Sequence, residues 1–463
     1  MRSKSSVRRF PAATAAVAGA LALSACGGGG SDPGAAEFSA EYSGTMAAWG
    51  FENADDVGQS RLDLAEGVLG ESDTTVELDP TSFDAQKFTT LAASGQVPDV
   101  VQMDRNFVAT YAAQGLIMPL EACFEAHDVD PGERWYEQVV DDVSWNDQIW
   151  AVPQFYQPPA ILLNERVMAE AGVSDTELNP AEQEAMLSAV ERMTVLEGST
   201  PTRLGFDPQG VSKAALWMMS FGGGIIDEEG LPTLDRAENV EAVEFLQQVY
   251  DAQGGYANVK SFLDSFDVFG DGNAYSNDLV GAAIWDQWYP NVLTPYAGEI
   301  EISAVPMMTQ DGEPITAASG SSFVIPTNAQ NPSAGCAWAL ELTSPEAWQA
   351  AGEARAETTA NDPDRQGINT GLFTGSPEVD TDLRDQFTDA AGFAGFDEAI
   401  STYYEVAAEG QSFGASPAGQ QIQSELQNAV TSALLGEADP ADALAQAQEA
   451  AMRAHDQVVG GGS

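Results

Sequence analysis

Hydrophobic positions along the chain follow two spacings, one typical of buried strands and the other of amphipathic helices. Short apolar runs predict strands at residues 42–49, 74–78, 97–104, 149–163, 279–285, 302–306 and 322–326. Apolar residues three and four apart predict helices at residues 56–69, 83–94, 108–114, 165–171, 181–196, 240–253, 333–343, 346–354, 400–408, 419–435 and 439–458. The periodicity is lost at residues 356–371, where a loose connection is expected. Alternation of strands and helices predicts an α/β fold.

The first 26 residues have the pattern of an export signal. Four basic residues precede the apolar stretch 12–23, which is too short to span a bilayer as a stable helix. Residues 23–26 read LSAC, which fits the lipobox of bacterial lipoproteins. Cys26 is then expected to carry a lipid anchor, because two acyl chains hold a protein at a membrane where one is marginal. An ordinary cleaved signal followed by a chance cysteine is the alternative.

Residues 27–37 are rich in glycine and predict a flexible tether between the lipid and the folded part. The protein is therefore expected outside the cytoplasm, on the outer face of the cell membrane. No later stretch approaches 18 uninterrupted apolar residues, so no second membrane crossing is expected.

The chain is strongly acidic, with 71 acidic and 18 basic side chains. Four basic residues lie in the signal, which leaves 14 against 71 and a net charge of −57. This charge argues against nucleic acid, whose affinity for proteins comes from Lys and Arg, and against adhesion to anionic lipid. The acidic residues are dispersed, which favours solubility; a cationic ligand is the alternative explanation.

About 425 residues follow the tether, which is more than one hydrophobic core usually holds and predicts two domains or lobes. Past the lipobox only Cys123 and Cys336 remain. In an exported protein such a pair is a disulfide candidate, although two separate buried thiols would have the same spacing.

Six short stretches together resemble family 1 of the extracellular solute-binding proteins of ABC importers, which includes maltose-binding protein. In chain order they are LAASGQVPDVV (91–101), GLIMPL (115–120), IWAVP (149–153) with LNE (163–165), GAAIW (281–285), FVIP (323–326) with AWAL (337–340), and LGEADPADAL (435–444). Each stretch is weak alone, but the set keeps the order of the family and covers nearly the whole chain. Leu163 and Glu165 depart from the aromatic and lysine usual there, at positions that are structural in the family.

The resemblance implies a two-lobe fold of the periplasmic-binding-protein type (class II), with discontinuous lobes joined by hinge strands. Lobe 1 would hold residues 38–156 and 318–362, and lobe 2 residues 157–317 and 363–463. The implied function is capture of a mono- or oligosaccharide in the cleft between the lobes and delivery to a membrane permease. The resemblance implies a monomer with no cofactor and no metal.

Candidate ligand contacts are residues in loops at the ends of predicted strands, where α/β proteins bind ligands. A sugar needs aromatic faces for stacking and amides or charges for its hydroxyls. The candidates after strands are Trp49, Glu52, Asn53, Asp104, Arg105, Asn106, Trp285, Asp286 and Trp288. Gln154, Tyr156 and Gln157 lie on the first predicted crossing between the lobes, and Gly320 and Ser321 on the second. Trp217 begins an aromatic run before three glycines, and the resemblance implies that the loop of Phe413 faces the cleft.

Each candidate also has a structural interpretation. Tryptophans 285 and 288 could pack under a helix, although their alternation with polar residues favours the cleft for at least one. Asp104 and Arg105 could form a surface ion pair of little value. A polyamine held by Glu52, Asp104 and Asp286 remains a second function. A secreted carbohydrate-active enzyme is a third, but no pair of carboxylates, nucleophile motif or metal site supports it.

Overall fold

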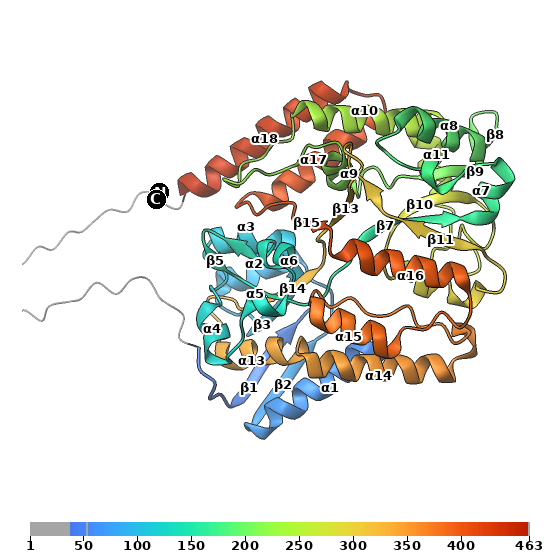
Figure 1. The fold of residues 1–463 in the computed structure, drawn as a ribbon. Coiled ribbons are helices and arrows are strands. Elements are labelled where there is room, and N and C mark those ends of the chain that lie inside the picture. Colours follow the sequence, from blue (N-terminus) through green and yellow to red (C-terminus); the bar gives the residue numbers. More distant parts are fainter. Residues whose placement is uncertain (1–37, 52–53, 462–463) are drawn as a thin grey trace, which may run out of the picture. The chain divides into compact units, whose positions relative to one another are not determined.

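The computed structural model describes residues 38–51 and 54–461, whose strands form two five-stranded sheets flanked by helices (Figure 1). The predicted signal, Cys26, the tether, Glu52 and Asn53 lie outside the described residues. None of the helices in this described part is long and apolar enough to cross a membrane. The α/β prediction is confirmed.

The first sheet has the strand order β2-β1-β3-β14-β6. β1 pairs in parallel with both β2 and β3, whereas β14 runs antiparallel to β3 and β6. The strands are β1 (Gly44–Trp49), β2 (Thr74–Asp79), β3 (Val100–Asp104), β6 (Val152–Pro153) and β14 (Ser321–Val324). The helices of this half of the fold include α1 (Asp56–Glu71), α2 (Ala85–Ser94), α13 (Pro332–Leu342) and α14 (Pro345–Asn361). α1 packs on β2 and on α13 and α14, and α13 packs on β1 and β3 (Figure 1).

Asp99 shows why the Pro-Asp-Val stretch matters to this sheet. One of its carboxylate oxygens accepts a hydrogen bond from the backbone N–H of Ala47 in β1 at 2.8 Å. The other accepts from the backbone N–H groups of Gln330 and Asn331, at 2.7 and 2.6 Å, just before α13. One buried carboxylate thus joins segments that are 230 residues apart in the sequence.

The second sheet has the strand order β11-β7-β10-β9-β8. β7 is fully buried and antiparallel to both β10 and β11, and β10 pairs in parallel with β9. The strands are β7 (Pro159–Asn164), β8 (Val195–Glu197), β9 (Thr200–Asp207), β10 (Val280–Asp286) and β11 (Ile302–Val305). Helices α8 (Gln183–Met193) and α16 (Ala394–Ala407) pack on this sheet, and α10 (Ala237–Asp251) packs on α8.

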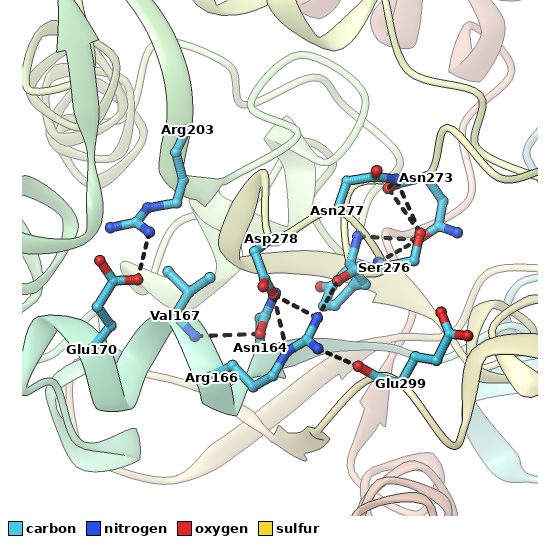
Figure 2. Close-up of polar contacts among 11 residues, drawn as sticks. Asn164, Arg166, Val167, Glu170, Arg203, Asn273, Ser276, Asn277, Asp278 and Glu299 are labelled. Atoms are coloured by element: carbon cyan, nitrogen blue, oxygen red, sulfur yellow. Dashed lines mark hydrogen bonds and ion pairs between the residues drawn. The ribbon is translucent and has the colours of Figure 1, made fainter.

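Polar contacts tie the start of helix α7 (Glu165–Ala171) to the turn before β10 (Figure 2). The carboxylate of Asp278 accepts two hydrogen bonds from the guanidinium of Arg166, at 3.1 and 2.8 Å, and one from the amide of Asn164 at 3.1 Å. The side-chain oxygen of Asn164 also caps α7 through the backbone N–H of Val167. These contacts fix the base of the loop that leads into β10.

The chain passes between the two sheets after β6 and again after β11. The second passage carries β12 (Met307–Met308) and β13 (Pro314–Ala317), which form a small sheet with β15 (Gly410–Gln411). The predicted lobe boundaries near residues 156 and 317 fall in these two passages. The predicted boundary near residue 362 falls at the end of α14, but the next helix, α15 (Pro377–Phe387), still packs on α14.

The structure differs from the sequence prediction in several elements. Helix α14 continues to Asn361, where a loose connection is expected from residue 356, and β9 and α15 are not predicted. The remaining elements are α3 (Val108–Ala113), α4 (Glu121–Ala126), α5 (Pro131–Arg134), α6 (Glu137–Asp141), α9 (Ala214–Ser220), α11 (Tyr256–Leu263), α12 (Tyr289–Val292), α17 (Gly419–Leu434), α18 (Pro440–Gly461), β4 (Ser144–Trp145), β5 (Gln148–Ile149) and four short 3-10 turns.

A disulfide joins Cys123 in α4 to Cys336 in α13, with the two Cα atoms 6.0 Å apart. Both sulfurs are buried beside the first sheet. Of the two arrangements that the sequence leaves open, the structure shows the bridge.

Candidate functional site

A cavity of about 850 Å³ lies where residues that follow strands of both sheets meet. The first sheet contributes residues after β1, β2 and β3 and the start of β14, and the second contributes residues after β10. This is the position in which open α/β sheets usually bind ligands. The volume is near the upper end of the range of about 300–1,000 Å³ for small-molecule sites.

Aromatic side chains line this cavity from several directions. Phe83 and Phe107 lie together on the first-sheet side, with ring centroids 5.3 Å apart. Trp288 lies on the second-sheet side, just after β10. The other aromatic lining residues are Phe155, Trp348 and Phe373. Such rings offer flat apolar faces to a ligand.

Four polar lining residues have a side-chain oxygen without a hydrogen-bond partner among the described residues. They are Gln102, Gln154, Gln287 and Ser321. Each of these oxygens is buried, and a buried polar atom without a partner costs free energy. Donors on a bound molecule, such as hydroxyl groups, would remove that cost.

Among the described residues, the charged side chains of the wall belong to two arginines and two aspartates. Arg355 is already paired, with hydrogen bonds to both carboxylate oxygens of Asp56 and to Asp55. Arg61 is buried with its guanidinium 3.9 Å above the ring of Trp348, and burial lowers its pKa to about 9. The described part of the wall therefore carries no excess of negative charge, although the chain as a whole is strongly acidic.

Asp104 stands at the end of β3 and lines both this cavity and a second one of about 270 Å³ beside the passages. Desolvation by the surrounding walls raises the pKa of its carboxyl, against the opposing effect of the Arg105 charge.

The predicted ligand contacts are divided by the structure into three groups. Those lining the larger cavity are Asp104, Gln154, Trp288 and Ser321. Those lining the second cavity are Asp104, Arg105, Asn106, Gln157, Asp286, Gly320 and Phe413. Those lining neither are Trp49, Tyr156, Trp217 and Trp285.

Three predicted aromatic contacts are packing residues in the structure. Trp49 is buried against Phe83, and its indole N–H donates to the hydroxyl of Thr81 at 3.2 Å. Trp217 is fully buried in the second-sheet core, where its N–H donates to the carbonyl of Pro208. Tyr156 is also fully buried, and its hydroxyl donates to the carbonyl of Ala407.

Trp285 supports its neighbour instead of lining the cavity. Its ring stacks on Tyr289 at 3.8 Å and meets Trp288 edge-on at 5.8 Å. Trp288 is thereby held in place with part of its surface on the cavity.

Arg105 and Asp286 are engaged by the protein itself. The Arg105 guanidinium donates to the carbonyl oxygens of Phe155 and Ala318, at 2.5 and 2.8 Å, and lies 3.3 Å from Asp142. Arg105 thus joins the end of β3 to both passages between the sheets. Asp286 forms an ion pair with Lys213 at 2.5 Å.

Sequence reasoning missed the lining residues that lie on helices or in the segment between α14 and α15. These include Arg61 on α1, Trp348 and Arg355 on α14, and residues 370–373. The rarity of basic residues was the available signal for the two arginines. No group of three or more Asp, Glu, His or Cys side chains that could hold a metal ion occurs in residues 38–51 and 54–461.

The model of the bacterial extracellular solute-binding proteins matches residues 69–363, which is more than half of the chain. The chain belongs to this family. The resemblance found in the sequence is thereby confirmed, and membership indicates a location outside the cytoplasm. The search of curated proteins found no match.

Solved structures of sugar-binding proteins share the two-lobe fold. CpMnBP1 with mannotriose bound is 18% identical, with a TM-score of 0.68 over 88% of this chain and 99% of the other. The GacH receptor of Streptomyces glaucescens, solved unliganded and with acarbose, is 19% identical, with a TM-score of 0.65 over 90% and 99%. The sugar-binding protein MalE from Xanthomonas citri is 14% identical, with a TM-score of 0.66 over 90% and 98%.

Proposed function

We propose that this solute-binding protein captures an uncharged carbohydrate in the 850 Å³ cavity. The observation that carries the proposal is the wall itself, where aromatic rings from both sides surround four polar residues with unpaired oxygens. Aromatic faces suit the C–H faces of a sugar, and the oxygens suit its hydroxyl hydrogens. The similar structures solved with mannotriose or acarbose bound support the same class of ligand.

We further propose that the protein is the substrate-binding component of an ABC importer. Closure of the lobes around the sugar would create the form that a membrane permease receives, because only contacts made in the closed state can shift the equilibrium toward closure. Cys26 would anchor the chain by lipid to the outer face of the membrane, and residues 27–37 would be the tether. The protein would act as a monomer.

The cavity wall does not favour a polyamine. Two arginines stand in the wall beside two aspartates, so a cation would meet charge of both signs. Asp286, which the polyamine hypothesis requires, is occupied by Lys213.

The residues that line the cavity also give no support to a glycosidase activity. A glycosidase needs one carboxyl group as acid and a second as base or nucleophile. In the described part of the wall the two lining carboxylates are Asp55 and Asp104, and Asp55 is committed to Arg355 and to the N-cap of α1. We therefore propose a binding protein without catalytic activity.

Isothermal titration calorimetry of the purified full-length protein tests the proposal. The titrants are neutral oligosaccharides of different sugars and, as the cationic probe, spermidine, each at two salt concentrations about tenfold apart. We expect binding of a neutral sugar with little salt dependence. Salt-sensitive binding of spermidine, with no response to any sugar, would overturn the carbohydrate proposal.

Trp288→Ala provides the matched variant, because Trp288 is the tryptophan that lines the cavity from the second sheet. Trp145→Ala is the control, since Trp145 lies on the short hairpin β4–β5 and lines neither cavity. The first change should weaken sugar binding and the second should leave it unchanged.

A further inference from the structure

Phe269 is an exposed aromatic residue that stacks on Trp288, a residue of the cavity wall. Its side chain is 72% exposed, the largest fraction among the exposed large hydrophobic residues of the described chain, and it is the only aromatic one of them. Its neighbours Phe266 and Val268 pack against the core instead. The sequence therefore places one ring outward from a loop whose other apolar residues face inward.

The ring of Phe269 continues the aromatic surface of the cavity. It stacks on Trp288 with ring centroids 5.9 Å apart and an interplanar angle of 17°. Trp288 lines the cavity and is itself supported edge-on by Trp285 and Tyr289. Two nearly parallel rings thus lead from the cavity wall toward solvent on the second-sheet side.

The loop that carries Phe269 is held by its own side chains. Buried Asn273 accepts hydrogen bonds from the backbone N–H groups of Tyr275 and Ser276 and donates to the carbonyl of Gly270. The amide of Asn277 donates to the carbonyl of Asp271 at 2.8 Å. Figure 2 shows Asn273, Ser276 and Asn277 beside the Asp278–Arg166 contact that fixes the base of the loop.

We propose that Phe269 is an outer stacking subsite for the second or later rings of an oligosaccharide whose first rings lie in the cavity. The proposal rests on the proposed carbohydrate-binding function and names the ligand as an oligosaccharide. A ring on a rigid loop costs little entropy to engage, so its stacking energy would appear in the affinity. Oligosaccharides too short to extend beyond the cavity would not reach Phe269.

The test compares Phe269→Ala with the unchanged full-length protein by calorimetry. The ligands are a length series, from monosaccharide to hexasaccharide, of a neutral sugar that the protein binds. We expect about a three- to tenfold loss of affinity for the longest members and none for the shortest. Phe269→Tyr should keep the affinity, and Leu435→Ala, which removes an exposed apolar side chain on another element, should change nothing.

The outcomes separate the two proposals. An equal loss at every length, or no loss at any length, would overturn the outer subsite while leaving the cavity as a carbohydrate site. Unchanged binding combined with loss of sugar uptake by cells would assign Phe269 to a permease contact and would also overturn it. Failure of the unchanged protein to bind any sugar would overturn the proposed function, and the subsite with it.

Discussion

Asp380 is expected to make the stability of the protein fall as pH rises through the mildly acidic range. Its carboxyl is fully buried in α15, where one oxygen accepts hydrogen bonds from the backbone N–H and hydroxyl of Thr374, at 2.6 and 2.8 Å. Burial raises the pKa from 3.8 to about 7, against those hydrogen bonds and a contact with Tyr136.

The direction in which stability changes with pH follows from proton binding to Asp380 in the folded and unfolded states. Between pH 4 and 7 the folded protein keeps a proton on Asp380 that the unfolded chain has lost, so the folded state is progressively destabilised as pH rises through this window. At about 1.4 kcal/mol per pKa unit, the difference between 3.8 and about 7 corresponds to at most about 4 kcal/mol. Asp380→Asn keeps an oxygen acceptor for Thr374 and cannot ionise, so it should remove this loss.

Urea unfolding of both proteins at intervals from pH 4.5 to 8.5 measures the effect. The variant should match the unchanged protein near pH 4.5 and exceed it increasingly up to about pH 7.5. Asp385→Asn is the control, because Asp385 is exposed on the same helix and its replacement removes the same charge. A difference between the Asp380 variant and the unchanged protein that does not vary with pH would refute the reasoning.

Three further predictions concern the cavity, the disulfide and the passages between the sheets. Trp288→Ala should weaken sugar binding at least about tenfold by calorimetry without changing the melting temperature by more than a few degrees, because the ring is partly exposed. Replacement of Cys123 and Cys336 by Ala should lower the free energy of unfolding by about 5 kcal/mol, since the bridge spans 213 residues, and equal urea midpoints would contradict this. Gly320→Ala would place a Cβ 2.2 Å from the guanidinium of Arg105, so it should lower the melting temperature markedly; an unchanged melting curve would show that the passages adjust freely.

Apolar periodicity predicts most of the central strands of the two sheets, although it misses β9. The runs around β3, β7 and β10 are fully or mostly buried, so their hydrophobic residues are nearly continuous in the sequence. Helix α15 escapes this reasoning, because it is mainly polar and packs through little more than Val379 and Leu383.

The candidate site could be predicted only where it follows strand ends. Asp104 is the last residue of β3 and Trp288 lies shortly after β10, so their neighbourhood follows from the fold class. Arg61 and Trp348 lie on helices, and periodicity does not tell which helix faces the cleft. Trp217 shows the reverse error, because an aromatic run before glycines looks like a loop site but belongs to a fully buried helix.

The order of strands in the two sheets also constrains how the chain can fold as it leaves the cell. A chain exported from its N-terminus delivers all strands of the second sheet, residues 159–305, before β14 and Cys336 emerge. The first sheet has β14 between β3 and β6, so it stays incomplete until that late segment arrives. The second sheet is therefore complete first, and β3, which lacks its neighbour β14 until then, is the edge that needs protection from aggregation during export.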